Sequence, residues 1–388
     1  MNNQITRRNL LKLLGVSGVA LPLTGISKEL DIKTNSIKQS GSVIKLSSNE
    51  NPYGPSPKVR NAIIDAFDEA CRYPYSRVSE LEKKIADREG VDPSMVLVTG
   101  GSNEGLRATG RLFGIEKKEI IACKPTYLAL MTYAEEFDCN INWVPLDNEL
   151  KYDLNEISKR TSKNTSMVFI CNPNNPTGTM LGADELEDFC VSTSKKTCVF
   201  VDEAYYDYSI NDGYPTMTKL VKEGLNVIVS RTFSKIYGLA GVRIGYLISS
   251  PERIAQLKKC TMAGTNMLAT HAAMTAYDEK SFFDYSLGKN KEALEIFYDT
   301  FEELNLDYVK SYTNFAFFKT GTHIDEFSKY MKDRGILVGR PFPPYYDWCR
   351  ISTGKIEDVR RFTPVSYTHL RAHETKAHLV CRLLLEKK

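Results

Sequence analysis

The stretch SMVFICNPNNPTGTM, residues 166–180, carries the clearest indication of the fold. Its first half is an apolar run without polar alternation, which is typical of a strand buried on both faces of a parallel sheet. Two Asn-Pro units and a Pro-Thr-Gly follow directly, so the strand ends in a rigid, irregular loop. Because prolines restrict the path of the chain, Asn172 and Asn175 can be presented at set positions. A turn without any function is the alternative.

Six more runs of this kind surround the first. They read MVLVTG, EIIAC, INWVPL, TCVFVDEA, NVIVSRT and RIGYLIS, and helix-like segments such as residues 183–196 separate several of them. Alternating strands and helices predict a doubly wound α/β fold with a mostly parallel seven-stranded sheet. A chain of 388 residues is long enough for two domains. We expect a large domain over 73–269 and a smaller α+β domain from 31–72 and 270–363.

Two helices are predicted before the first strand. SPKVRNAIIDAFDEA places one apolar face along a helix, made of Val59, Ile63, Ala66, Phe67 and Ala70. SELEKKIADREG begins with a capping box from Ser79 to Glu82 and stops at Gly90. These faces are typical of packing surfaces rather than of binding sites.

The composition excludes several classes of protein. A hydrophobic content of 42% and a charged content of 26% are those of a soluble globular protein. The net charge of +3 comes from the two ends of the chain, and no basic stripe with interleaved aromatics indicates a nucleic-acid partner. Nine cysteines without a C-x-x-C pair argue against a disulfide framework and against a cysteine-rich metal site.

Both ends differ from the middle. TRRNLLK, residues 6–12, precedes an apolar run too short to span a membrane, and it resembles the twin-arginine export signal. We expect residues 1–30 to direct export to the periplasm or cell envelope; an ordinary N-terminal extension of a cytoplasmic protein is the alternative. Residues 364–388 resemble translated adaptor sequence. Their metal-like spacing of His369, His373, His378 and Cys381 is given no function.

Polar and aromatic residues follow the predicted strands, where open α/β sheets bind ligands. Gly101 ends a glycine turn, and Ser102 and Asn103 then open a helix whose free N–H groups can hold a phosphate. A capped tight turn is the alternative. Tyr127 follows another strand, where an aromatic ring either stacks on a planar ligand or belongs to the core.

Two further strand ends carry ionisable groups. Asp202 ends the apolar run VFVD, and a buried carboxylate requires a cation or a strong donor. Tyr205 lies three residues further along the chain. Lys235 follows the next strand in RTFSKIYGLAGVRIGY, residues 231–246, together with Thr232, Ser234 and Arg243. Taken alone, this lysine is more typical of a solvated surface charge.

One cofactor would use all of these groups. Pyridoxal phosphate (PLP) requires an amine for its aldehyde and a carboxylate for its ring nitrogen. It also requires donors for its phenolate oxygen, an aromatic face and a phosphate cradle. The strand ends supply every group: Lys235, Asp202, Asn175 with Tyr205, Tyr127, and the turn at Ser102 with Thr232, Ser234 and Arg243.

The motifs LSSNENPYGPSP, RYPYS, TGGSNEGL, NPNNPTG, VDEAY, SKIYGLAGVRIGY and CRISTG occur in this order. Over residues 43–363 the chain therefore resembles the fold type I PLP-dependent aminotransferases, and among them the histidinol-phosphate aminotransferase family. The resemblance implies a large PLP-binding domain, with Lys235 bound to the cofactor aldehyde and Asp202 paired with its ring nitrogen. It also implies that Asn175 and Tyr205 hold the phenolate oxygen and that Tyr127 stacks on the ring.

The same resemblance implies a homodimer with shared sites, in which Tyr73 reaches the phosphate of the neighbouring subunit. Arg350 would bind the substrate α-carboxylate with help from Asn172. Arg340 and Tyr53 would contact the substrate side chain. The reaction implied is transfer of an amino group from an amino acid to a 2-oxo acid by a ping-pong mechanism, with Lys235 as the general acid and base.

Two features depart from this family. An exported enzyme would not meet histidinol phosphate, which is made inside the cell, and GRPFPPYYDWC, residues 339–349, differs from the usual family version. A related PLP enzyme that oxidises, cyclises or decarboxylates its amino acid is the main alternative, because Lys235 and Asp202 would serve it equally. A non-catalytic binding protein is disfavoured by the intact Lys235 and Arg350, and a nicotinamide dehydrogenase by the missing G-x-G-x-x-G.

Overall fold

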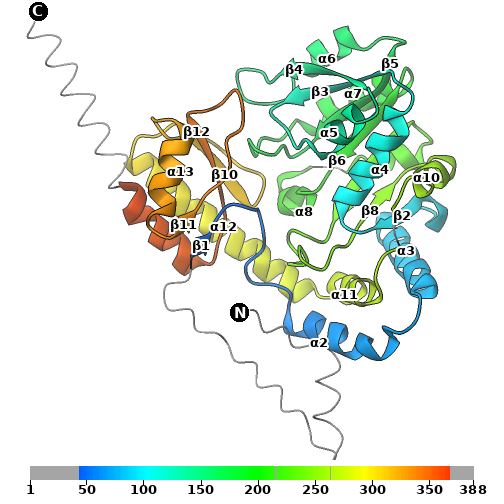
Figure 1. Cartoon of the computed structure of the whole chain (residues 1–388), viewed down its shortest axis with the longest axis horizontal. Helices are drawn as coiled ribbons and strands as arrows, with labels where there is room; N and C mark the ends of the chain where they lie inside the picture. Colours follow the sequence, from blue (N-terminus) through cyan, green and yellow to red (C-terminus); the bar gives the residue numbers. More distant parts are fainter. Residues whose placement is uncertain (1–42, 215, 263, 368–388) are drawn as a thin grey trace, which may run out of the picture. The chain divides into compact units, whose positions relative to one another are not determined.

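The computed structural model describes residues 43–214, 216–262 and 264–367 (Figure 1). The predicted export signal, residues 1–30, and most of the adaptor-like segment 364–388 lie outside these residues. Within them, no helix is both long enough and apolar enough to cross a membrane. The same residues contain no cluster of three or more histidine, cysteine or acidic side chains arranged to hold a metal ion.

The main sheet has seven strands in the order β2-β8-β7-β6-β5-β3-β4. β8 is antiparallel to both of its neighbours, and every other pair is parallel. The bounds are β2 Val96–Thr99, β3 Glu119–Lys124, β4 Asn140–Pro145, β5 Thr165–Cys171, β6 Cys198–Asp202, β7 Val227–Thr232 and β8 Gly245–Ile248. Each predicted apolar run forms one of these strands, so the predicted α/β fold with a mostly parallel seven-stranded sheet is confirmed.

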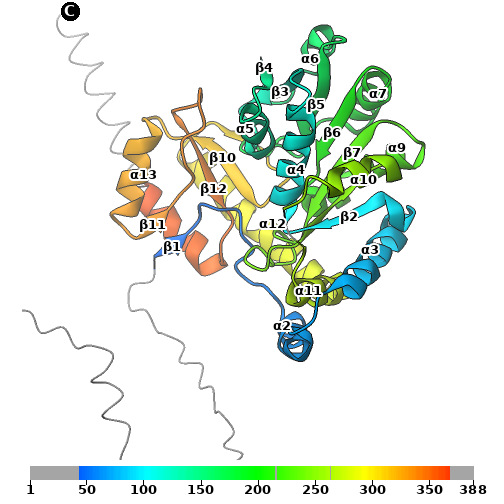
Figure 2. The same cartoon turned by 45° about the vertical axis from the view of Figure 1, so that its right-hand side comes forward.

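Helices cover both faces of this sheet. α4 and α5 lie on one side, and α6, α7 and α9 lie on the other (Figure 2). Crossovers between parallel strands are right-handed, so the direction in which the strand order runs decides the face on which each helix packs. The bounds are α4 Ser102–Gly114, α5 Ala129–Glu135, α6 Leu154–Arg160, α7 Ala183–Ser194 and α9 Thr218–Lys222.

Most of the remaining helices of this part lie at the antiparallel end of the sheet, where α11 packs against α2 and α3, and α3 and α10 pack against β2. Their bounds are α2 Pro57–Asp65, α3 Tyr75–Glu89, α8 Tyr206–Ser209, α10 Pro251–Lys258 and α11 Met267–Tyr277. Short 3-10 turns are η1 Ala66–Glu69, η2 Pro93–Met95 and η3 Ile210–Asp212.

Both helices that were predicted to precede the sheet are present, but two details of the prediction are wrong. α3 begins at Tyr75 rather than at a Ser79 cap, and the Ser79 hydroxyl donates to the Tyr75 carbonyl at 3.2 Å inside the helix. Gly90 ends the helix as predicted, with φ at 66°, a conformation in which glycine has no side chain to clash. Phe67 is 60% exposed, so the predicted packing face does not bury all of its members.

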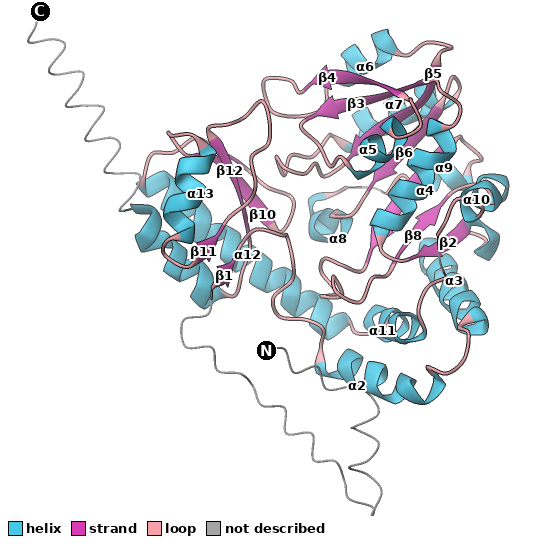
Figure 3. Cartoon of the chain, in the orientation of Figure 1, coloured by secondary structure: helices cyan, strands magenta, loops and turns pink. Residues whose placement is uncertain are grey.

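A second hydrophobic core lies apart from the main sheet. β10 (Phe315–Lys319) pairs antiparallel with β12 (Trp348–Ser352) and β9 (Tyr308–Val309), as Figure 3 shows for the first two. β1 (Ile44–Lys45) pairs with β11 (Ile336–Leu337), so the start of the described chain joins its last third. Helices α12 (Lys280–Glu303), α13 (Ile324–Lys332) and residues 356–367 supply the rest of this core, whose largest members are Phe297, Phe301, Phe318, Phe327 and Phe362.

Candidate active site

A cavity of about 700 Å³ opens at the carboxyl ends of the parallel strands, where doubly wound sheets bind their ligands. The opposite wall of the cavity is formed by residues 337–341 and Arg350, from the part of the chain that contains the second core. The site residues predicted from the sequence that line this cavity are Ser102, Asn103, Tyr127, Asn175, Asp202, Tyr205, Ser234, Lys235, Arg243, Arg340 and Arg350.

Lys235 follows β7 and points its amine into the cavity. Its Nζ donates to the carbonyl of Asn49 at 3.2 Å and lies 5.4 Å from the centre of the Tyr205 ring. Burial lowers the pKa of Lys235 to about 8, and the positive charge of Arg350 acts in the same direction. A sizeable fraction of this amine is therefore neutral near physiological pH, as a nucleophile or a general base requires.

Asp202 ends β6 between Cys171 on β5 and Ser230 on β7. It is 2% exposed, and its Oδ1 has no hydrogen-bond partner. Burial raises the pKa of Asp202 to about 7, against the opposing effects of the Ala204 N–H and of Lys235. An unpartnered buried carboxylate oxygen is costly, so a donor or cation bound in the cavity would complete this site.

Asn175, Tyr205 and Arg350 form a hydrogen-bonded chain along one wall of the cavity. Arg350 donates through Nη1 to Asn175 Oδ1 at 2.8 Å, and Asn175 donates through Nδ2 to the Tyr205 hydroxyl at 3.4 Å. The Tyr205 ring meets Phe315 edge to face, with ring centres 5.3 Å apart. Burial raises the pKa of Tyr205, so its hydroxyl stays protonated and can donate to an anionic oxygen.

Arg350 comes from β12 of the second core, and its guanidinium is held on several sides. Nη2 donates to the carbonyl of Ser47 at 2.6 Å, and the group lies 5.0 Å from the centre of the Phe342 ring. Its buried Nε has no partner. Burial lowers the pKa of Arg350, although a guanidinium remains charged at all physiological pH values. The arrangement leaves a desolvated cation that requires an anion.

A second group of residues forms a concave end of the cavity around the start of α4. Gly101 turns the chain with φ at 82°, and the backbone of Ser102 then begins the helix. Arg243 reaches this turn through weak bonds of 3.4 Å to the Gly100 carbonyl and to the Ser234 hydroxyl. Helix N–H groups and a guanidinium together form an anion site.

Two neighbours complete this end. Thr232 does not line the cavity; its hydroxyl donates to Ser234 Oγ at 2.9 Å and accepts from the Ser234 N–H, so it orients Ser234. Tyr127 is mostly buried, and its hydroxyl lies 3.4 Å from Asn103 Oδ1. Its ring forms part of the cavity wall above the turn, where it can cover a planar ligand.

The outer rim carries a second cation. Arg340 is exposed, donates to the Pro341 carbonyl at 3.0 Å and places its guanidinium 4.4 Å from the centre of the Phe342 ring. Phe342 therefore contacts both arginines of the cavity, Arg340 on the rim and Arg350 inside. This ring belongs to the unusual segment 339–349, which thus shapes the space between the two charges.

Besides Gly101 and Thr232, three predicted residues do not line this cavity. Asn172 is buried and its Oδ1 accepts from the Leu181 N–H at 2.8 Å, so the amide that contacts Arg350 is that of Asn175 instead. The Tyr53 hydroxyl accepts from the Ile356 N–H at 3.0 Å, outside the cavity. Tyr73 is 80% exposed on the surface of its own chain.

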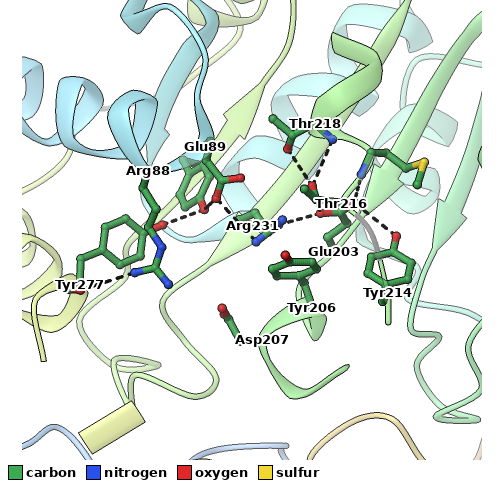
Figure 4. Close-up of polar contacts among 12 residues, drawn as sticks. Arg88, Glu89, Glu203, Tyr206, Asp207, Tyr214, Thr216, Thr218, Arg231 and Tyr277 are labelled. Carbon is green, nitrogen blue, oxygen red and sulfur yellow. Dashed lines mark hydrogen bonds and ion pairs between the residues drawn. The ribbon is translucent and has the colours of Figure 1, made fainter. Parts of the chain in front are cut away.

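A buried ionic network links β7 to α3 and to Glu203, the residue that follows β6 (Figure 4). Arg231 on β7 donates to Glu203 at 2.7 Å and lies 3.7 Å from Glu89 of α3, and its guanidinium lies 3.6 Å from the centre of the Tyr206 ring. Glu203 also accepts from the Met217 N–H at 2.7 Å. The neighbour of Asp202 in the sequence therefore has its charge neutralised outside the cavity.

Several residues that line the cavity were not predicted from the sequence, and Asn49, within the quoted motif LSSNENPYGPSP, makes the most contacts with the predicted site residues. Asn49 is buried and bonds both the Tyr205 hydroxyl and Lys235. Nothing in the segment SSNEN distinguishes this asparagine from Asn51, because its partners are more than 150 positions away in the sequence. The motif resemblance was the only available signal, and it drew attention to Tyr53 instead.

The residues of the cavity fit PLP. The unpartnered Asp202 Oδ1 suits a protonated ring nitrogen, and the free amine of Lys235 suits an aldehyde. Asn175 and Tyr205 offer donors to a phenolate oxygen. The turn at Gly101 suits a phosphate, because a side chain there would collide with Arg243, whose Cζ would lie 2.8 Å from the added Cβ.

Comparisons with known proteins agree with this chemistry. The family "Aminotransferase class I and II" matches residues 41–363. The chain is similar to histidinol-phosphate aminotransferase of Caldicellulosiruptor saccharolyticus, with 35% identity over 350 residues that cover 88% of this chain and 93% of that protein. It is also similar to histidinol-phosphate aminotransferase of Brevibacillus brevis, with 37% identity over 297 residues, or 76% and 81% of the two chains.

Solved structures show the same fold. Histidinol-phosphate aminotransferase from Sinorhizobium meliloti, in complex with pyridoxal-5'-phosphate, has a TM-score of 0.77 at 23% identity and covers 85% of this chain and 91% of that one. The enzyme of that name from Clostridium acetobutylicum has a TM-score of 0.77 at 19% identity, covering 85% and 100%. With the family match and the fit of the cavity, these findings identify the chain as a member of the class I and II aminotransferases, a PLP-dependent transaminase.

Proposed function

We propose that this aminotransferase moves an amino group from an amino acid to a 2-oxo acid by a ping-pong mechanism. The observation that supports this proposal is the position of Arg350, a buried cation with an unpartnered Nε, in the same cavity as the free amine of Lys235. Donor and acceptor both carry a carboxylate beside the reacting carbon. A single guanidinium can therefore orient both substrates in turn.

Arg350 binds the carboxylate and fixes the orientation of the substrate. Its guanidinium is already oriented by Asn175 and by the Ser47 carbonyl, so little side-chain freedom is lost on binding. Desolvation strengthens the attraction to an anion. Because Lys235 lines the same cavity, its amine is available to the α-carbon of an amino acid bound in this way.

Lys235 moves the proton. PLP, when bound, carries the amino group between the two half-reactions and accepts the electron pair released at the α-carbon. With its pKa lowered to about 8, the Lys235 amine can take the α-proton as a base and return it as an acid. Asp202 would hold the ring nitrogen of the bound cofactor through its unpartnered Oδ1, and Tyr205 and Asn175 would donate to the ring oxygen.

The donor class follows from the two cations. Both arginines line the same cavity. In this proposal Arg350 binds the α-carboxylate, and Arg340 at the rim contacts the end of the substrate side chain. Similar proteins are named for histidinol phosphate, which carries no carboxylate. The reshaped segment 339–349 and the predicted export signal favour an amino acid over that donor.

A donor panel tests this proposal. L-amino acids and histidinol phosphate are added to the PLP-loaded protein, the cofactor spectrum is followed, and the 2-oxo acid formed is quantified. We expect at least one amino acid to give a kcat/KM about tenfold above that of histidinol phosphate. A higher kcat/KM for histidinol phosphate than for every amino acid would overturn the donor class, while leaving the transaminase intact.

The role of Lys235 has its own test. Lys235→Ala removes the amine that moves the proton, so we expect kcat to fall by about 10³-fold or more. Lys117→Ala, on the surface, serves as the matched control and keeps wild-type kcat. Full transamination by Lys235→Ala would contradict the mechanism. Carbon dioxide or ammonia with peroxide as products would indicate the alternative reaction types instead.

A homodimer is proposed as the working form. Residues 64–75 expose four large apolar side chains, with Ile64 at 61%, Phe67 at 60%, Tyr73 at 80% and Tyr75 at 75%. Exposed apolar groups gathered in one segment are typical of a protein interface. In such a dimer Tyr73 would reach the phosphate site of the partner subunit.

Export by the twin-arginine route is proposed from TRRNLLK, residues 6–12. This route carries folded proteins, so the cofactor could be installed before transport. We expect residues 1–30 to export a fused reporter protein, and Arg7→Lys with Arg8→Lys to retain it in the cytoplasm. Export of the double variant at the wild-type level would contradict this route.

A further inference from the structure

Asn49 lies between β1 and α2 and has an unusual backbone. It is 1% exposed, and its φ of 54° is in the left-handed region. Asparagine adopts this conformation more readily than most residues, but at some cost in energy. A buried polar residue held in this conformation indicates that its contacts determine the path of the chain.

Its backbone contacts the proton-moving residue. The carbonyl of Asn49 accepts from Lys235 Nζ at 3.2 Å and from Asn314 Nδ2 at 3.0 Å. A carbonyl oxygen has two lone pairs, so these bonds are compatible. The amine of Lys235 has a defined resting position as a result, whenever it is not bonded to another group.

Its side chain contacts the other two functional elements. Nδ2 donates to the Tyr205 hydroxyl at 2.9 Å. The hydroxyl of Ser352 donates to Asn49 Oδ1 at 2.7 Å and accepts from the Asn49 N–H at 2.8 Å. Ser352 lies on β12, two residues after Arg350. One asparagine therefore bonds the amine, the phenol and the strand that carries the guanidinium.

We propose that Asn49 is a positioning residue for transamination, which fixes the Lys235 amine and the Tyr205 hydroxyl relative to the strand that carries Arg350. Tyr205 belongs to the core of the main sheet, and the strand of Arg350 contributes Cys349 and Ile351 to the second core. The position of a substrate bound by Arg350 relative to Lys235 therefore depends on how firmly the two cores are held together. Misplacement by about 1 Å can cost a hundredfold in rate. This inference rests on the transaminase activity and not on the identity of the donor.

The first test separates positioning from binding. Asn49→Gly keeps the left-handed backbone and the carbonyl but removes the bonds to Tyr205 and Ser352 Oγ through the side chain. We expect kcat to fall at least about tenfold, with the donor KM changed less than about threefold. The matched control is Asn305→Gly, an exposed asparagine with φ at 52°, which should keep wild-type kcat.

The second test needs no turnover. The full chain is freed of PLP, and Lys235 is labelled with a trace acylating reagent across a range of pH. The charged and titratable groups that act on its amine are Asp202, Arg350, Glu50, Arg243 and the Tyr205 phenol. Asn49→Asp adds a carboxylate beside them, so we expect the half-labelling pH to rise by about half a unit or more. Asn305→Asp should leave it unchanged.

A kcat within twofold of wild type in Asn49→Gly, or an unchanged half-labelling pH in Asn49→Asp, would overturn the proposal. If Asn49→Gly does not fold, Ser352→Ala replaces it, because it removes both Ser352 bonds and leaves Asn49 whole. A kcat at least about threefold lower supports positioning, and an unchanged kcat contradicts it. Failure of every donor in the panel would leave the labelling result intact, so the two proposals fail separately.

Discussion

Asp202 and Lys235 show at the scale of single residues how one environment produces opposite effects. Both lose hydration in the same cavity, and the neutral form of each is favoured. The pKa of the carboxyl therefore rises to about 7, while that of the amine falls to about 8. Asp202 is buried and Lys235 is half-buried, so the charge of each depends on what the cavity binds.

This dependence predicts how the PLP-free protein responds to pH. The folded-state pKa of Asp202 is raised, so its contribution to stability is present at acid pH and is lost as pH rises from about 4 towards 7. The side chain of Asp202→Asn is neutral at every pH, so the stability of this variant should not show this decline. We expect the Tm difference between variant and wild type to grow in favour of the variant from pH 4 to pH 7, as measured by calorimetry.

The control for this prediction is Asp212→Asn, since Asp212 is exposed. Its Tm should run parallel to that of the wild type across the same range. A constant difference between Asp202→Asn and the wild type would mean that Asp202 is already ionised in the PLP-free protein. That result would contradict the effect of burial described here.

At the scale of elements, the junction of β2 and α4 depends on Gly101. Its φ of 82° and ψ of 160° belong to a region that is essentially restricted to glycine. Gly101→Ala should lower the free energy of unfolding by about 1–3 kcal/mol and should weaken PLP binding, because the new Cβ displaces Arg243. Denaturant titration and PLP titration measure the two effects.

Gly241→Ala is the matched control, because nothing lies within 4 Å of its added Cβ and its φ is not positive. It should bind PLP as the wild type does. If Gly101→Ala also binds PLP with wild-type affinity, the turn does not form the phosphate end of the site.

The strand pair β6–β7 depends on the buried pair Glu203–Arg231. The side chains are 0% and 6% exposed, so loss of one partner leaves an uncompensated charge. Arg231→Met should lower the free energy of unfolding by about 3–5 kcal/mol. Denaturant melts should show a much smaller change for Arg60→Met on the surface. Equal effects of the two substitutions would mean that the network does not stabilise these strands.

The seven strands could be predicted from the sequence because buried parallel strands are nearly continuous apolar runs, as in MVFIC and VFVD. The start of α3 could not be predicted from such a local pattern. Ser79 and Glu82 match a capping box, yet the helix extends back to Tyr75, because tertiary contacts decide how far a helix continues. The helix end at Gly90 was predictable, since a left-handed residue stops a helix locally.

At the scale of the whole molecule, the predicted sharing of sites between subunits has a direct test. Tyr73→Ala and Lys235→Ala should each be inactive or nearly so as homodimers. After the two are mixed and allowed to exchange subunits, about a quarter of wild-type activity should return, because half of the dimers are mixed and each has one intact site. Activity that does not rise on mixing, while subunit exchange is shown by a tag, would contradict the shared site.

The sequence by itself determined the seven strands and the ionisable and polar residues at their carboxyl ends, because a strand end and the residue that follows it are local features. Lys235, Asp202, Asn175 and Tyr205 could each be identified in this way. The tertiary structure alone decided that Arg350 contacts Asn175 rather than Asn172, and that Asn49 bonds Lys235 and Tyr205. These contacts join residues more than 150 positions apart, whose pairing depends on how the two cores pack and not on any local pattern.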